Sequence, residues 1–413
     1  MAGPTVNGRR LNATIEALGK IGETPEGMQR VAFSTADVEG RRYVMDLMAG
    51  AGLQVRMDPA GNIIGRREGS DRQAPAIALG SHVDTVPSGG KYDGALGVLA
   101  AIESVRTLDD HGITTGHPLE VLVFTNEEGT TFNRWLLGSR AMAGAWDKAD
   151  LDAADPVGTS LAEYFPRIGG DLDRVEEAAR REGDLHAYLE LHIEQGPVLH
   201  RTAVPVGVVS GITGRSVFQV VAKGTANHAG TTPMDNRRDA LLAASRLITA
   251  VNTIVAEEET CRVGTVGTVA VKPTSAVNVI PGEVELGVEF RDIDMESLDH
   301  AERRLNEVAR DIAGATDTEV LINRLERGLS CPIGGDVRDV VARAARNLGL
   351  ESIVIPSGAG HDAQAIANIT RVGMIFVPSV DGISHSREEY TTPQDCVNGA
   401  NVLLNTMLDL DRA

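Results

Sequence analysis

Four short polar segments of the chain carry the residue types that bind divalent metal ions. They are Ser81-His82-Val83-Asp84, Asn126-Glu127-Glu128, His192-Ile193-Glu194-Gln195 and Gly382-Ile383-Ser384-His385-Ser386. The first three directly follow predicted strands, and the fourth lies a few residues after the last one. Because open parallel sheets bind ligands at the carboxyl ends of their strands, we expect all four segments to converge on one crevice.

The composition of this set indicates a hydrolytic metal centre. Imidazoles and carboxylates occur without a cysteine, and such a mixture suits Zn, Mn, Co or Ni. In His82-x-Asp84 a carboxylate lies close enough in sequence to fix the tautomer of the imidazole. Taken singly, each segment has a plainer interpretation, since a histidine after a strand is usually a hydrogen-bonded loop residue and a Glu-Glu pair is usually a solvated turn.

A glycine-rich loop, Gly89-Gly90-Lys91-Tyr92-Asp93-Gly94, supplies a candidate bridging carboxylate in Asp93. Its glycines allow a tight turn that returns the carboxylate to the sheet edge, where it could bridge two ions roughly 3.5 to 4 Å apart. A phosphate cradle is the alternative for this loop, but the G-x-x-x-x-G-K-[ST] pattern is missing. No G-x-S-x-G motif is present either, so a serine hydrolase would lack its usual nucleophile turn.

The elements that must position these residues alternate between strands and helices. Apolar, unalternating strands are predicted over 76–80 and 119–125, and a further strand ends at 189–191. Helices are predicted over 37–52 and 94–109. This alternation predicts a largely parallel sheet covered on both faces.

The pattern changes near Ser210-Gly211. An alternating strand over 217–223 is followed by a helix over 238–258, strands over 265–272 and 283–292, and a helix over 297–313. The order β-α-β-β-α is typical of an α+β sandwich with an antiparallel sheet. We therefore expect a discontinuous first domain, residues 1–210 and 330–413, interrupted by a second domain over 211–329.

The alternating pattern of the first domain returns after Cys331. Helices are predicted over 336–348, 362–368 and 394–410, and strands over 353–355 and 373–377. The polar segment from about 147 to 187 shows only a candidate helix over 171–181. The predicted fold class is α/β, with a mainly parallel sheet and an inserted α+β sandwich.

Composition excludes several classes of protein. The chain has 413 residues, with 39 Lys plus Arg against 58 Asp plus Glu, and a formal net charge of −19. This balance disfavours nucleic acid and anionic membrane surfaces as partners. Three separated cysteines, with no C-x-x-C pair and no signal-peptide or membrane-spanning pattern, favour a cytoplasmic protein.

Longer motifs carry a resemblance to a known family. SHVDTVPSGGKYDG, TNEEGTTFNRWLLGSRAMAG, LHIEQGP, NHAGTTPMDNRRDA, PSGAGHDAQ and DGISHS resemble, in this order, the hydantoinase/carbamoylase amidases. These belong to the dinuclear aminoacylase and carboxypeptidase metallohydrolases. The resemblance covers about residues 80 to 390, including the inserted domain.

The resemblance implies two divalent metal ions and a division of roles among the polar segments. His82, Asp93 and His192 would bind one ion, whereas Asp93, Glu128 and His385 would bind the second. Glu127 would be the general base, and Asp84 would orient His82.

Residues of the inserted domain would complete the site. The resemblance implies that His228 stabilises the oxyanion from a partner subunit, and that Asn278 and Arg291, flanking a predicted hairpin, bind the substrate carboxylate. Without the resemblance, Arg291 would be read as an ion pair with a nearby aspartate. Gln195 and Gly360 complete the expected substrate contacts, and a homodimer through the inserted domain is implied.

The expected activity is hydrolysis of the carbamoyl group of an N-carbamoyl-L-amino acid, a small ureido carboxylate. Allantoate amidohydrolase and β-ureidopropionase remain open, because they share the same residues. A peptidase or aminoacylase is less favoured. A metal-binding protein without catalysis is the alternative from another class, and an intact Glu127 argues against it because binding alone needs no base.

Overall fold

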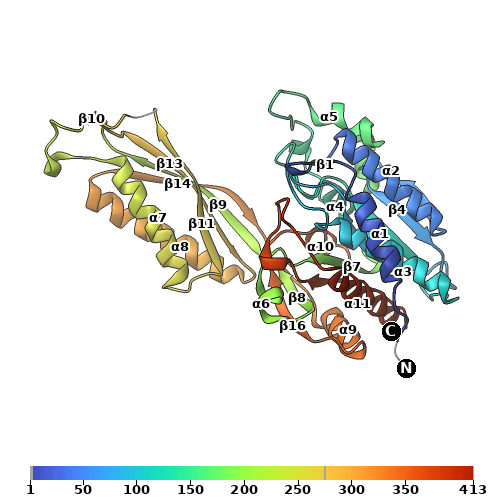
Figure 1. Ribbon diagram of the computed structural model, residues 1–413. Helices are drawn as coiled ribbons and strands as arrows, with labels where there is room; N and C mark the ends of the chain where they lie inside the picture. The colour runs from blue at the N-terminus through green and yellow to red at the C-terminus, as the bar shows by residue number, and fades with distance from the viewer. Residues whose placement is uncertain (1–2, 274–275, 413) are drawn as a thin grey trace. The chain divides into compact units, whose positions relative to one another are not determined.

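The computed structural model describes residues 3–273 and 276–412 and divides into two compact units. The first comprises the chain up to Ser210 and from Ile333 onward, and the second is Gly211–Pro332. A ribbon view identifies their elements (Figure 1). Within the described residues, no helix is long and apolar enough to cross a membrane. All three cysteines are buried and free.

The first unit is built on a mixed, mainly parallel sheet. Its strands lie in the order β8-β17-β7-β5-β6-β4-β3, with β16 beside β8. The strands β5, β6, β7 and β17 run parallel, whereas β3, β4 and β8 pair antiparallel with their neighbours. The bounds are β3 Gln54–Met57, β4 Ile63–Arg67, β5 Ala76–His82, β6 Leu119–Phe124, β7 Leu185–Ile193, β8 Val206–Ile212, β16 Ser352–Ser357 and β17 Val372–Val377.

The central strands are buried on both faces. Every residue of β5, β6 and β17 is buried, as expected for parallel strands without polar alternation. Helices α3 and α11 pack against β7, and α10 contacts both β7 and β17. The helices of this unit are α1 Gly8–Leu18, α2 Thr35–Gly50, α3 Ala95–Asp110, α4 Leu137–Met142, α5 Leu161–Tyr164, α6 Val198–Thr202, α9 Gly335–Asn347, α10 Asp362–Ile366 and α11 Pro393–Asp411.

The second unit is a four-stranded antiparallel sheet with two helices on one face. Its strand order is β11-β13-β9-β14, and α7 and α8 lie side by side against it (Figure 1). Alternate residues of β9 and β13 are buried beneath the helices. The bounds are β9 Gly214–Lys223, β10 Asn227–His228, α7 Ala240–Ala256, β11 Val263–Lys272, β12 Val279–Ile280, β13 Glu283–Asp292, α8 Met295–Thr316, β14 Glu319–Gly328 and β15 Cys331–Pro332.

The α/β class with a mainly parallel sheet and a separate antiparallel sheet is confirmed, but the local predictions depart from the structure in places. The strands β3, β4, β8 and β14 were not expected. The segment 171–181, predicted to hold a helix, contains the 3-10 helix η3 Leu172–Ala178. The hairpin expected between Asn278 and Arg291 is not formed, because β12 pairs with β10 while β13 pairs with β9 and β11.

The remaining short elements lie in loops of the first unit. They are β1 Glu23–Thr24, β2 Gly27–Met28, η1 Lys148–Asp150, η2 Phe165–Ile168 and η5 Val380–Gly382.

Candidate metal centre

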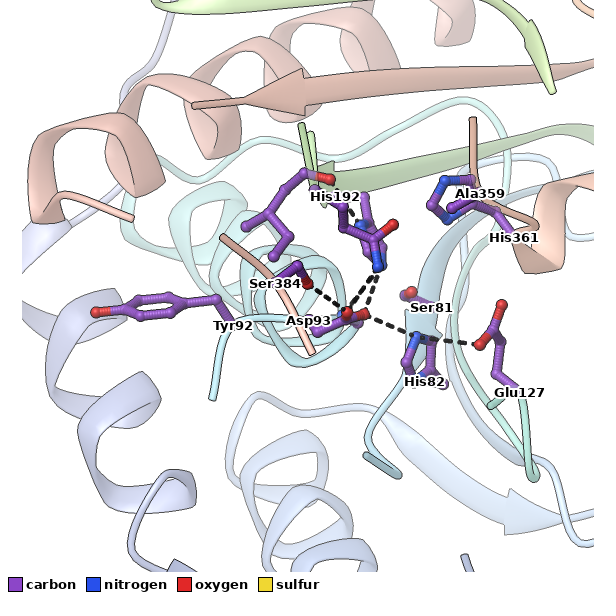
Figure 2. Close-up of polar contacts among 12 residues, drawn as sticks. Ser81, His82, Tyr92, Asp93, Glu127, His192, Ala359, His361 and Ser384 are labelled. Carbon is purple, nitrogen blue, oxygen red and sulfur yellow. Dashed lines mark hydrogen bonds and ion pairs between the residues drawn. The ribbon is translucent and has the colours of Figure 1, made fainter. Parts of the chain in front are cut away.

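His82 is the last residue of β5, and a backbone hydrogen bond orients its ring. Its Nδ1 lies 2.9 Å from the carbonyl oxygen of Asp84, which accepts the Nδ1 hydrogen. In the neutral ring this assignment leaves Nε2 without a hydrogen, as a ligand atom must be. Nε2 points to two carboxylates, 3.5 Å from Asp93 Oδ1 and 3.7 Å from Glu127 Oε2 (Figure 2).

His192 is held in the same way on a neighbouring strand. It lies within β7, next to its end, and not after the strand as the sequence suggested. Its Nδ1 donates to the carbonyl oxygen of Ile193 at 2.9 Å, and its Nε2 lies 3.1 Å from Asp93 Oδ1. Because β5 and β7 are parallel neighbours, His82 and His192 reach the same edge of the sheet.

Asp93 lies between two histidines on one side and a third on the other. Its Oδ1 faces His82 and His192, whereas its Oδ2 lies 3.4 Å from Nε2 of His385. The next residue, Gly94, has φ 62°, and a side-chain Cβ there would overlap the His82 ring. A glycine is therefore required for Asp93 and His82 to approach each other.

The Glu127-Glu128 pair follows β6 in a turn whose first residue, Asn126, has a left-handed φ of 52°. Both glutamate amides donate to the Asp84 carboxylate, Glu127 N to Oδ1 at 3.3 Å and Glu128 N to Oδ2 at 3.2 Å. The same carboxylate is 3.9 Å from Nδ1 of His82. The part of Asp84 that orients His82 is thus its backbone carbonyl, and its carboxylate holds the glutamate turn.

Burial and mutual attraction shift the pKa values in this cluster. Burial alone would lower the pKa of His82, but the carboxylates of Glu127, Asp93 and Asp84 together outweigh it and raise this pKa well above its ordinary value. Burial would raise the pKa of Asp93, yet His192 and the other histidines hold it well below its usual range. Burial, with Asp93 adding to it, raises the pKa of Glu128 to about 8. Three carboxylates packed this closely favour a cationic occupant.

The donor atoms fit divalent metal ions. Three sets of ligand atoms each lie within 4.8 Å of one another: His82, Asp93 and His192; Asp93, Glu128 and His385; and His82, Glu127 and Glu128. Among the described residues, Glu128 Oε1 is buried and has no hydrogen-bond partner, so a lone pair is available for a ligand. Nitrogen and carboxylate donors without a thiolate suit divalent first-row metals such as zinc and manganese.

Comparison with known proteins gives the family. Residues 78–409 match the family model described as peptidase family M20/M25/M40. The chain belongs to this family. Within it, the chain is a hydantoinase/carbamoylase family amidohydrolase, a hydrolase acting on carbon–nitrogen bonds.

Individual relatives match over nearly the full length. The chain is 42% identical to the N-carbamoyl-L-amino acid amidohydrolase of Geobacillus stearothermophilus, over 98% of this chain and 99% of that protein. It is 37% identical to the ureidoglycolate hydrolase of Arabidopsis thaliana, over 98% of this chain and 87% of that protein. The crystal structure of a hydantoinase/carbamoylase family amidase from Burkholderia multivorans superposes with a TM-score of 0.92 at 38% identity, covering 99% of each chain.

Two further predicted residues of this amidohydrolase lie beside the cluster of histidines and carboxylates. Gln195, with a left-handed φ of 57°, donates from Nε2 to Asp93 Oδ2 at 2.8 Å. Gly360 precedes His361, whose ring centroid is 4.5 Å from that of His192. A Cβ at Gly360 would press on the ring of Trp135, so a larger residue does not fit there without rearrangement.

The predicted residues of the second unit include one close pair. His228 is on β10 and pairs with Val279 of β12, and the amide of Ala229 donates to the Asn278 carbonyl at 2.9 Å. Both His228 and Asn278 are exposed. Arg291 lies on β13, where its Nη2 donates to Glu289 Oε1 at 3.0 Å. This partner is a glutamate two residues away.

Sequence reasoning missed several buried residues that support the cluster. Glu190 accepts Ser81 Oγ at 2.8 Å and the Ala363 amide at 2.9 Å, and so ties β5, β7 and α10 together. Arg30 donates from Nε at 2.6 Å to the carbonyl oxygen of Val83, the residue directly before Asp84. Their partners are distant in sequence, so no local spacing could have revealed them.

Proposed function

We propose that the chain hydrolyses N-carbamoyl-L-amino acids. One water and one substrate molecule would give the amino acid, ammonia and carbon dioxide. The observation that carries this proposal is the buried carboxylate of Glu127 at the edge of a cluster with three histidines and Asp93. Full-length similarity to a relative named for this activity supports the choice of substrate class.

Two divalent ions are proposed as cofactors. His82, Asp93 and His192 would hold one, and Asp93, Glu128 and His385 the other, with Asp93 common to both sets. When bound, such ions polarise a carbonyl group and lower the pKa of water. Zn, Mn, Co and Ni all suit these donors.

Glu127 is the proposed general base. It removes a proton from the attacking water and returns it to the leaving nitrogen of the ureido group. Burial, with the charge of His82 opposing it, raises the pKa of this carboxyl well above its ordinary value. A carboxylate of raised pKa accepts a proton more readily, which suits removal of the proton from water. The Asp84 carboxylate accepts hydrogen bonds from the amides of Glu127 and Glu128, and so fixes the direction in which the Glu127 side chain points.

The proposed oxyanion donor is His228. Its Nδ1 accepts the Gly230 amide hydrogen at 3.0 Å, so in the neutral ring the hydrogen is on Nε2. An exposed Nε2–H is a suitable donor to the oxygen that gains charge in the transition state.

Asn278 and Arg291 are the proposed ligands of the substrate carboxylate, since a guanidinium binds a carboxylate through two parallel hydrogen bonds. Gln195 and Gly360 are proposed to contact the substrate from the side of the metal cluster. We further propose that the chain acts in the cytoplasm as a homodimer formed through the inserted domain.

Ureidoglycolate is the second candidate substrate. The observation that favours it is 37% identity to a ureidoglycolate hydrolase over nearly the whole chain. Allantoate and β-ureidopropionate carry the same ureido and carboxylate groups and belong in the same test.

Ammonia release from a panel of N-carbamoyl-L-amino acids, ureidoglycolate, allantoate and β-ureidopropionate tests the proposal. Each assay is run after chelation and after reloading with Mn, Co or Zn. The proposal predicts the highest kcat/KM with an N-carbamoyl-L-amino acid, and no turnover after chelation. The highest kcat/KM with another ureido compound would show that this compound, and not an N-carbamoyl-L-amino acid, is the preferred substrate. No turnover on any of them at full metal content would favour a binding protein.

A further inference from the structure

A buried glutamate outside the predicted set holds the backbone of the bridging aspartate. Glu389 is 5% exposed. Its Oε1 accepts two amide hydrogens, from Tyr92 N at 3.0 Å and from Asp93 N at 3.1 Å. Adjacent amides bound to a single carboxylate oxygen fix the peptide plane before Asp93, and with it the direction in which that side chain leaves the loop.

The second oxygen of Glu389 binds a residue of its own loop, which also carries another predicted ligand, His385. Oε2 accepts the hydroxyl of Ser384 at 2.9 Å, and the same hydroxyl lies 3.2 Å from Asp93 Oδ2. Figure 2 shows Ser384 beside Asp93. Ser384 directly precedes His385, so its contact with Asp93 and the two amide bonds of Glu389 join the loops of two predicted ligands. The Glu389–Ser384 bond itself braces the loop of His385.

The glycine-rich loop is shaped to receive this carboxylate. A Cβ at Gly90 would overlap the side chain of Glu389, including Oε1 and Cβ. Gly90 therefore has a role beyond turn formation, since only a glycine admits Glu389 at that point.

We propose that Glu389 is a positioning residue of the metal centre. Together with Ser384, it holds Asp93 so that Oδ1 faces His82 and His192 while Oδ2 faces His385. It does so through hydrogen bonds and is not a ligand itself. This inference rests on the proposed metal centre but not on the identity of the substrate.

Metal binding to the full-length chain tests the proposal. Glu389→Ala removes all three hydrogen bonds. Glu389→Gln keeps an oxygen for the two amides and places an NH₂ group beside Ser384. Ser384→Ala removes the hydroxyl that contacts Glu389 and Asp93 but leaves the two amide bonds of Glu389. Glu388→Ala is the matched control, since Glu388 is exposed and pairs with Arg387. Mn²⁺ stoichiometry and affinity are measured by competition with a chelator, and Co²⁺ loading is followed by visible absorption.

For Glu389→Ala we expect about a 10- to 100-fold loss of Mn²⁺ affinity and an altered Co²⁺ spectrum. Glu389→Gln should recover most of the affinity, Ser384→Ala should weaken one of the two ions, and Glu388→Ala should match the wild type. Unchanged affinity in folded Glu389→Ala would overturn the proposal, as would an equal loss in the Gln variant. If Glu389→Ala does not fold, unchanged binding by Ser384→Ala together with weak binding by Glu389→Gln overturns it. Failure of the wild type to bind two ions would instead refute the proposed metal centre.

Discussion

Glu127 Oε2 lies 3.7 Å from Nε2 of His82, the nitrogen that also faces Asp93. The neighbouring Glu128 points to another part of the cluster, with Oε2 3.6 Å from Nε2 of His385. Asp84 fixes this divergence, because its two carboxylate oxygens each accept one of the two glutamate amides. Adjacent residues of the same type can thus have separate roles.

Glu128→Gln is expected to reduce bound Mn²⁺ from two ions to one per chain. The neutral amide is a poorer ligand, and Glu128 belongs to the set with Asp93 and His385. His385→Ala should give the same result, whereas His192→Ala should weaken the other ion. Elemental analysis after gel filtration measures the stoichiometry. Two tightly bound ions in Glu128→Gln would remove this residue from the ligand set.

Asp37 gives a prediction for stability against pH. Burial, partly opposed by the charge of Arg41, raises the pKa of Asp37 from 3.8 to about 6. Between pH 3.8 and about 6 the folded chain binds more protons at Asp37 than the unfolded chain. The free energy of unfolding therefore falls as the pH rises through this range, and this decrease ends above pH 6. The full decrease corresponds to about 3 kcal/mol.

We expect Asp37→Asn to have a higher free energy of unfolding than the wild type. This difference should be about 1 to 2 kcal/mol larger at pH 8 than at pH 5. Urea unfolding at the two pH values measures this difference. Asp46→Asn, an exposed position on the same helix, is the control and should show no such trend. A gain from Asp37→Asn that is the same at both pH values would contradict the raised pKa.

An asymmetric ion pair supports the N-terminal helix. Arg10 binds Glu103 through Nε at 2.7 Å and Nη2 at 2.8 Å, with the arginine side chain 30% exposed and the glutamate 2% exposed. Arg10→Ala would leave a buried carboxylate without its cation, and should cost about 3 kcal/mol of unfolding free energy. Glu103→Gln leaves a partly exposed arginine that still reaches Asp110, and should cost about 1 kcal/mol. Urea unfolding measures the two losses of unfolding free energy. Equal losses, or a larger loss for Glu103→Gln than for Arg10→Ala, would contradict this assignment.

The sequence predicted the site best where metal-binding types of residue lie at the ends of strands. His82, Glu127 and His192 were found because they end or follow buried strands, and parallel strands end at one edge. Glu389 could not be found in this way. Two of its three hydrogen-bond partners are backbone amides almost 300 positions earlier, and a hydrogen bond to an amide leaves no pattern of side-chain types.

The missed strand β14 has a comparable cause. It is an edge strand with mixed burial, and its segment Glu319–Gly328 mixes charged and apolar residues without a clear period of two. Its pairing with β9 determines its structure. The short strands β10 and β12 likewise depend on pairing between residues about 50 positions apart.

Turnover of Glu127→Gln at confirmed metal content is the most direct test of the proposed hydrolysis. Glutamine keeps the size of the side chain but cannot accept the proton of the attacking water. With both ions still bound, kcat for ammonia release from an N-carbamoyl-L-amino acid should fall by about 10²- to 10⁴-fold. Near-normal turnover by the metal-loaded variant would show that Glu127 is not the base and would contradict the proposed mechanism.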